Sequence, residues 1–145
     1  MSIARFLAPA SQSVATSFGL LSLRVVAGYA MALHGLGKLQ SEKGASGWME
    51  GMGASSLLES LAPIAPFAEL IGGGLLVLGL VTPLAALLVI GTMVGAVSYH
   101  MGFGQPFVAG GAPSYELAAL HLVAALTLLC AGPGGFSIDR FVFKR

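Results

Sequence analysis

Four apolar runs, separated by polar or glycine- and proline-rich stretches, dominate the hydrophobic pattern of the chain. They cover residues 14–36, 63–81, 84–103 and 114–131. Each is close to the about 20 residues that an α-helix needs to cross a hydrocarbon layer about 30 Å thick. The pattern therefore predicts an all-α membrane protein, a four-transmembrane-helix bundle that forms one domain over residues 1–145.

The segments between the runs predict how these helices connect. Residues 38–60 are the long polar stretch, and within it residues 48–58 mix Trp, Met and Leu with acidic residues. This outer loop could therefore carry a short interfacial helix. Pro83 opens the third helix, because a proline in the first turn removes no helical hydrogen bond. Residues 104–113 form an uncharged loop, and the glycines within 132–135 end the fourth helix.

Composition excludes several classes of protein. The chain is 56% hydrophobic and 9% charged, with a mean hydropathy of +0.88, whereas a soluble domain is roughly 25% charged. Seven basic against six acidic residues give no basic surface for nucleic acid, and one cysteine gives no disulfide framework. Residues 1–17 lack the apolar segment and cleavage site of a signal peptide, so we expect the first helix to be retained.

The distribution of basic residues predicts the orientation of the helices. Four spans place both termini on one side, and the terminal segments carry Arg5, Arg140, Lys144 and Arg145. The loop at 38–60 has two lysines against three glutamates, and the loop at 104–113 has no charge. Because basic residues favour the cytoplasmic side, both termini are predicted to be cytoplasmic and the long loop to lie outside.

Six ionisable residues fall within the apolar runs or at their ends. They are Arg24, His34, Glu69, His100, Glu116 and His121. A charge at the centre of a membrane helix costs about 2.5–3.5 kcal/mol, so such residues are candidates for function. Given the helix directions, these groups gather in the outer half of the bundle. The expected arrangement is a polar pocket that opens toward the outer leaflet, with Arg24 at its floor.

Arg24 remains protonated in proteins and is expected to pair with Glu69 or Glu116. The other carboxyl group would then be spare, and a spare buried carboxyl beside histidines is what a proton relay needs. The alternative is that Arg24 and its partner only clamp two helices together.

Small residues recur at helical spacing in the second and third runs, at Ala68 and Gly72 and at Gly91 and Gly95. In lipid, such positions let helix backbones approach closely. Helix packing is the favoured interpretation, and contact with a ligand is the alternative.

In these residues the chain resembles the DoxX family of small four-span membrane proteins. The segments that carry the resemblance are Arg24 to Gly28, His34 to Leu39, Glu69 to Gly74, Leu78 to Pro83, His100 with Gly102 and Phe103, Glu116, Gly132 to Gly134, and Ser137 to Asp139. Pro83 departs from the family, which usually has Arg or a polar residue there. The resemblance implies four helices in the cytoplasmic (inner) membrane. It also implies an association with redox chemistry, because related proteins include quinone-reducing subunits of a thiosulfate oxidoreductase and partners of oxidative-stress enzymes.

The favoured function is therefore that of a quinone-linked oxidoreductase subunit. His34, His100, His121 and Lys38 are the candidate contacts to the quinone, while Glu69, Glu116 and Arg24 are the candidate catalytic residues. No flavin or iron–sulfur motif is visible in the sequence, so a redox partner protein or a bound cofactor would supply the electrons.

Three other functions are left open. Histidines and glutamates from four helices could hold iron, copper or zinc, although Glu116 and His121 do not have the Glu-x-x-His spacing of di-iron bundles. A carrier or binding protein for a small solute is another possibility. Carriers usually alternate access between two repeated halves, so a four-helix chain would need to form a homodimer to supply both halves. A membrane scaffold for soluble enzymes would use the buried charges only for packing.

Overall fold

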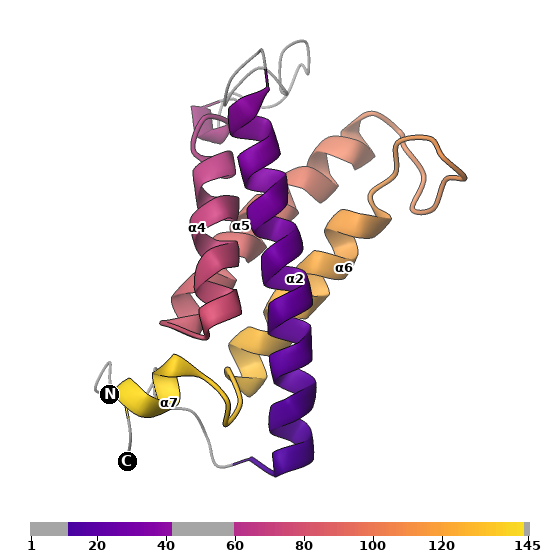
Figure 1. Cartoon of the computed structure of the whole chain (residues 1–145). Coiled ribbons are helices and arrows are strands. Elements are labelled where there is room, and N and C mark those ends of the chain that lie inside the picture. The colour runs from indigo at the N-terminus through magenta and orange to yellow at the C-terminus, as the bar shows by residue number, and fades with distance from the viewer. Residues whose placement is uncertain (1–11, 42–59, 144–145) are drawn as a thin grey trace.

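The computed structural model describes residues 12–41 and 60–143, which form helices and no strand. The helices are α2 (Val14–Gln40), α4 (Ala65–Leu78), α5 (Thr82–Gly102), α6 (Glu116–Ala131) and α7 (Ile138–Val142) (Figure 1). The first four correspond to the four apolar runs, and Pro83 lies in the first turn of α5 as predicted. The short helix expected at 48–58 lies outside the described residues.

Helix length separates two of the four long helices from the other two. With 27 and 21 residues, α2 and α5 are about 40 and 31 Å long, and both are apolar enough to cross a membrane. With 14 and 16 residues, α4 and α6 are apolar but only about 21 and 24 Å long. Two helices therefore meet the length and composition of a membrane span by themselves.

Large apolar side chains point outward along these helices, among them Val26, Ile71, Leu84 and Leu120. The buried positions hold smaller or polar side chains more often, including two buried alanines on α5. Extended apolar surface of this kind is unusual in a soluble monomer and is typical of a surface that contacts lipid or a partner.

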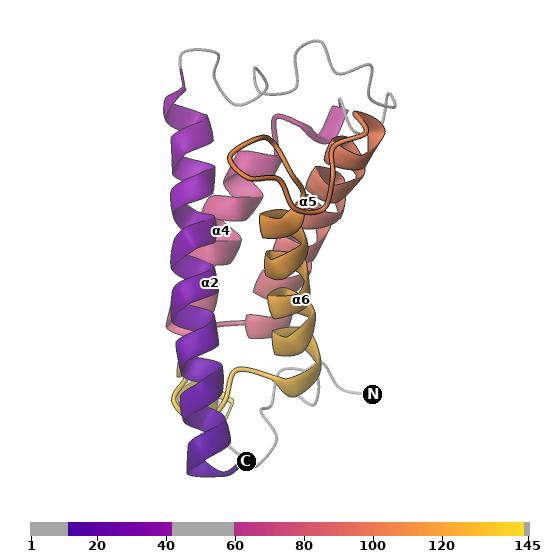
Figure 2. The same cartoon turned by 90° about the vertical axis from the view of Figure 1, so that its right-hand side faces the viewer.

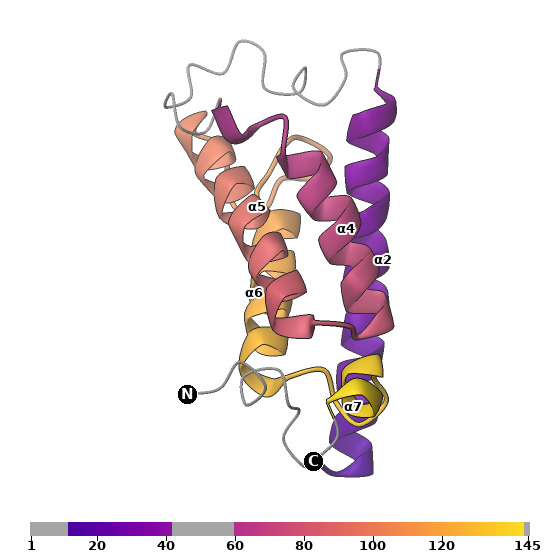
Figure 3. The same ribbon diagram turned by 90° about the vertical axis from the view of Figure 1, so that its left-hand side faces the viewer.

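The helices pack as two pairs. The most extensive contact is between α2 and α4, and α5 packs against both α6 and α4. We call the end where α2 finishes and α4 begins the Lys38 end. The loop between α5 and α6 lies there as well (Figure 2). At the opposite end, the Asp139 end, α4 passes directly into α5, and residues 132–143 fold back beneath the bundle (Figures 1 and 3).

Glycines bring α2 and α4 into backbone contact. A Cβ atom added at Gly28 would lie 2.7 Å from the carbonyl oxygen of Gly73, and one added at Gly35 would collide with the carbonyl oxygen of Pro66. Gly72 packs on the other side of α4, against α5. Gly72 and Gly73 of α4 thus serve helix packing, whereas Gly74 has nothing within 4 Å of an added Cβ atom. Gly91 differs, because a Cβ atom there would meet nothing within 4 Å.

Replacing Gly35 with alanine is expected to destabilise the protein by about 1–3 kcal/mol, because the new methyl group forces α4 away from α2. Gly37 lies on the same helix with open space around its Cα atom, and alanine there should be neutral or stabilising. Thermal unfolding of the two purified variants in detergent checks the difference. Equal stability of both would contradict close packing at Gly35.

Candidate functional site

An ion pair joins α2 to α4 at the Lys38 end. The Nζ atom of Lys38 lies 2.6 Å from Oε1 of Glu69. Lys38 belongs to the last turn of α2, and Glu69 lies in the first half of α4. The pair is asymmetric, because the Glu69 side chain is 1% exposed while that of Lys38 is 25% exposed. Within the described part of the chain, Oε2 of Glu69 has no hydrogen-bond partner.

Two histidines meet about one turn of α2 away from this ion pair. The rings of His34 on α2 and His121 on α6 are 6.2 Å apart between centroids and meet edge to face. Nδ1 of His121 lies 2.9 Å from the carbonyl oxygen of Leu117. A carbonyl only accepts, so Nδ1 carries the proton and Nε2 of a neutral ring is left as an acceptor. His34 lies one helical turn before Lys38, on the same side of α2.

We name His34, Lys38, Glu69 and His121 the Lys38–Glu69 cluster. The structure thus places four of the seven predicted site residues in two pairs, Lys38 with Glu69 and His34 with His121. Helix α2 links the pairs, because His34 and Lys38 lie one turn apart on it. His100 instead hydrogen-bonds Gln105, and its ring contacts that of Tyr99 at 5.1 Å. Glu116 is half-buried at the start of α6 and forms no ion pair with any residue in 12–41 or 60–143.

Arg24 lies at the other end of the molecule, which overturns the predicted pairing with Glu69 or Glu116. Its Nη2 group donates to the carbonyl oxygen of Phe136 at 2.7 Å. Along α2 it is about 21 Å from Lys38, at about 1.5 Å per residue. The physical reason is that residues 132–143 fold back and supply partners for the guanidinium. Arg24 therefore does not form the floor of a pocket beside the histidines.

Asp139, six residues from the last residue of the sequence, is fully buried at this end. Its carboxylate accepts hydrogen bonds from the backbone N–H groups of Val81 at 2.6 Å and Thr82 at 2.9 Å. Its own N–H donates to the carbonyl oxygen of Gly79 at 2.8 Å. A carboxylate at a helix N-terminus pairs N–H groups that the helix leaves free and also favours the helix dipole. Asp139 thus caps α5 from the far end of the chain.

The connection between α4 and α5 depends on this cap. Gly79 has φ +63° and lies directly against the Arg24 guanidinium, so a side chain there would be strained and would collide. Val81 has φ 43°, an uncommon conformation for a β-branched residue. The sequence contains one signal that a helix turn holds Asp139 in place. Ser137, which precedes Ile138 and Asp139, is the N-cap of α7, where its side chain accepts a hydrogen bond from the N–H group of Arg140.

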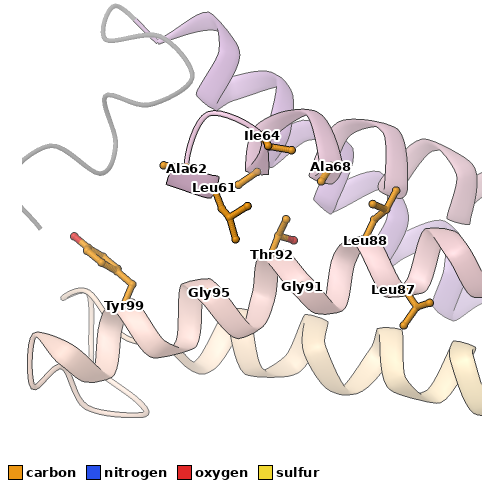
Figure 4. A pocket seen from close by; sticks show the side chains of 11 residues that line it. Leu61, Ala62, Ile64, Ala68, Leu87, Leu88, Gly91, Thr92, Gly95 and Tyr99 are labelled. Atoms are coloured by element: carbon orange, nitrogen blue, oxygen red, sulfur yellow. The ribbon is translucent and has the colours of Figure 1, made fainter. Parts of the chain in front are cut away.

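A pocket of about 260 Å³ lies between α4 and α5 (Figure 4). Its walls are apolar, with Leu61 and Ile64 from the segment just before α4 facing Leu88 and Gly91 of α5. It contains none of the predicted site residues. The predicted polar pocket does not correspond to this one, because the charged groups lie between α2 and α4, whereas the hollow lies between α4 and α5.

Within the described ranges, no three His, Cys, Asp or Glu residues lie together as metal ligands would.

Comparison with known proteins identifies the family. Residues 19–102, from α2 to the end of α5, match the family model DoxX. The chain is 32% identical over 126 residues to a protein of Bacillus subtilis (strain 168) named "Putative oxidoreductase CatD", covering 87% of this chain and 88% of that protein. No solved structure matches the chain. The resemblance seen in the sequence is thereby confirmed: the chain belongs to the DoxX family.

Proposed function

We propose that this protein is the membrane-integral, quinone-linked subunit of an oxidoreductase, in which the Lys38–Glu69 cluster exchanges protons with the quinone. Two facts from the comparisons support a redox function: the family, and a relative named as an oxidoreductase. The cluster supplies the chemical argument.

In this proposal α2, α4, α5 and α6 all cross the cytoplasmic (inner) membrane. The outward apolar side chains of all four helices support it. The shorter α4 and α6 are accommodated by local thinning of the bilayer or by their flanking residues. The basic residues of the terminal segments place both termini in the cytoplasm, so the Lys38 end faces outward.

The observation that carries the proposal is the buried carboxylate of Glu69. A charge in this setting is costly, and one that served only to clamp helices would gain most by having both oxygens paired. Instead, Oε1 is paired with Lys38 and Oε2 is left without a partner in the described residues. Because Lys38 is partly exposed, the pair connects a buried proton acceptor to the surface.

The histidines supply further groups of the kind that a quinone needs. A quinone reduced by two electrons takes up two protons on its carbonyl oxygens. An imidazole N–H donates to such an oxygen, and the bare nitrogen of a neutral imidazole accepts from the hydroxyl of the quinol. His34 and His121 meet about one turn of α2 from Lys38, and Nδ1 of His121 donates to a carbonyl oxygen, which leaves Nε2 of a neutral ring as an acceptor. The two electrons would come from an external donor, either a small reductant such as a reduced flavin or a redox partner protein.

Quinone reduction by the purified protein tests the proposal. The protein is reconstituted in phospholipid vesicles with a menaquinone, and quinol is followed by absorbance. Thiosulfate, a small thiol and reduced flavin mononucleotide are supplied in turn as electron donors. We expect at least one donor to give quinol formation above that of protein-free vesicles. Inactivity with every donor, together with no bound quinone, would contradict the proposal.

A further inference from the structure

The two members of the Lys38–Glu69 ion pair differ in their contact with the surface. Lys38 donates to Oε1 of Glu69 at 2.6 Å, and its side chain is 25% exposed, whereas that of Glu69 is 1% exposed. Lys38 lies in the last turn of α2, at the Lys38 end of the bundle (Figure 1). The buried carboxylate is therefore connected to the surface at that end through the ammonium group of Lys38.

Toward the Asp139 end, backbone contact closes the interface between α2 and α4. Gly73 follows Glu69 by about one turn of α4. A Cβ atom added at Gly73 would lie 2.5 Å from the backbone nitrogen of Ala32 and 2.5 Å from the carbonyl oxygen of Gly28. A water molecule needs a cavity of at least about 10–15 Å³ with polar partners around it. Backbones packed this closely leave no such cavity between them at this level.

Apolar side chains fill the centre of the bundle at the next level. Met31 precedes Lys38 by seven residues of α2, or about 10 Å along the helix. Leu76 follows Glu69 by seven residues of α4. Both side chains are 1% exposed, and both belong to the hydrophobic core, as does Leu128 of α6. None of these side chains has a proton to donate, so this layer separates Glu69 from the Asp139 end.

The charged groups at the Asp139 end are themselves shielded. Arg24 is 1% exposed, and Asp139 is fully buried. The two carboxylate oxygens of Asp139 accept from two backbone N–H groups at the start of α5, and an arginine keeps its proton in proteins. Along α2, Arg24 is about 21 Å from Lys38. A proton that entered at this end would meet the apolar layer before it reached Glu69.

The titratable groups around Glu69 lie toward the other end. Glu69 is the titratable residue of α4 itself. On the neighbouring helices, five titratable residues lie in the half of their helix nearer the Lys38 end: His34 on α2, Tyr99 and His100 on α5, and Glu116 and His121 on α6. The rings of His34 and His121 meet, and His100 contacts Tyr99 and bonds Gln105. Groups that can exchange protons with Glu69 are thus found on the Lys38 side of the apolar layer.

We propose that Glu69 exchanges protons with the aqueous phase on the Lys38 side of the membrane only. The ammonium group of Lys38 passes a proton to the Glu69 carboxylate, and the resulting amine takes a new proton from water at its exposed side. This inference rests on the proposed function, in which the four helices cross the membrane and the cluster supplies protons to a quinone. The external donor supplies the electrons, while the protons of the quinol come from one side of the membrane.

Labelling with dicyclohexylcarbodiimide tests one-sided access without a quinone or an electron donor. This apolar reagent adds to protonated carboxyl groups. The protein carries an affinity tag after its C-terminus and is placed in sealed phosphatidylcholine vesicles at low protein density. Vesicles that expose the tag have the Asp139 end outside and bind an affinity column, whereas the opposite orientation flows through. Peptide mass spectrometry measures label at Glu69 in each preparation, and Glu69→Gln supplies the background.

The pH inside the vesicles is held constant while the outside pH is varied. Where the Lys38 end faces outward, labelling of Glu69 should slow by up to about tenfold for each unit by which the outside pH is raised, because only the protonated carboxyl reacts. Where the Asp139 end faces outward, the outside pH should have no effect. A protonophore, which equalises the pH on both sides, should remove the difference between the two preparations.

A measurement without a reagent covers the case in which the carbodiimide is too large to reach Glu69. The infrared C=O band of a protonated carboxyl is recorded on the same two preparations, and the spectrum of Glu69→Gln is subtracted. The band should follow the outside pH in the preparation with the Lys38 end outside and be unaffected in the other.

Two outcomes would overturn the inference. Protonation that follows the pH on the Asp139 side, or on both sides equally, would show that protons pass the apolar layer. Neither label nor infrared band at any pH would show that Glu69 takes up no proton. Failure of the proposed function is recognised separately, because one-sided protonation in a protein that forms no quinol would support the proton path and contradict the quinone.

Discussion

Replacing Asp139 with alanine is expected to destabilise the protein by about 2–4 kcal/mol, because each buried N–H group left without an acceptor costs about 1–3 kcal/mol. The change removes the acceptor of the Val81 and Thr82 N–H groups at the start of α5. It also leaves the charge of Arg24, whose side chain is 1% exposed, without the carboxylate that interacts with it. Thermal unfolding in detergent measures the loss.

Two further variants show whether stability depends on the Asp139 cap itself or on any change in the C-terminal segment. Arg140→Ala, at an exposed neighbouring position, should change stability by less than about 0.5 kcal/mol. The double variant Arg24→Met with Asp139→Ala should lose less stability than the two single changes together, because no buried charge is then left unpaired. Strict additivity would contradict coupling between Arg24 and Asp139.

The positions of the long helices could be predicted from sequence because hydropathy is a local property. Each apolar run corresponds to a helix that begins and ends within a few residues of the predicted bounds. The first apolar run ends at residue 36, whereas the helix α2 continues to Gln40. That last turn makes Lys38 part of the helix and places it on the side of His34, as the proposed function requires.

The partners of the buried charges could not be predicted in the same way. Whether Arg24 pairs with Glu69 or with the carbonyl oxygen of Phe136 depends on the path of the chain after Gly132, where the helix stops and the backbone turns with φ +78°. Hydropathy carries no information about such a return. A charged residue near a terminus is usually solvated, so Asp139 was not recognised as a buried cap.

The roles of the individual small residues could not be predicted from the sequence pattern either. Gly72 and Gly91 both occur at helical spacing from another small residue, yet one packs against α5 and the other faces a hollow. The difference is set by the angle at which α4 and α5 diverge, which depends on the whole connection at Gly79 to Thr82.

Replacing Glu69 with glutamine is expected to slow quinol formation by about 10²- to 10⁴-fold, the range for loss of a positioned proton-transfer group. Glutamine keeps the volume of the side chain and can still hydrogen-bond Lys38, whose side chain is partly exposed and can turn to water. The variant should therefore fold. Glu116→Gln is the comparison for the second glutamate, and it should retain most of the activity because Glu116 lacks an ion pair in the described residues.

The most direct measurement is the single-turnover rate of quinol formation in vesicles, compared between the wild type and Glu69→Gln with the same electron donor. The account predicts a folded variant, with unchanged quinone binding and an unfolding temperature near that of the wild type, that forms quinol at least about a hundredfold more slowly. A folded variant that forms quinol at the wild-type rate would contradict a proton-transfer role for the Lys38–Glu69 cluster. A variant that cannot fold would show that Glu69 serves the structure instead.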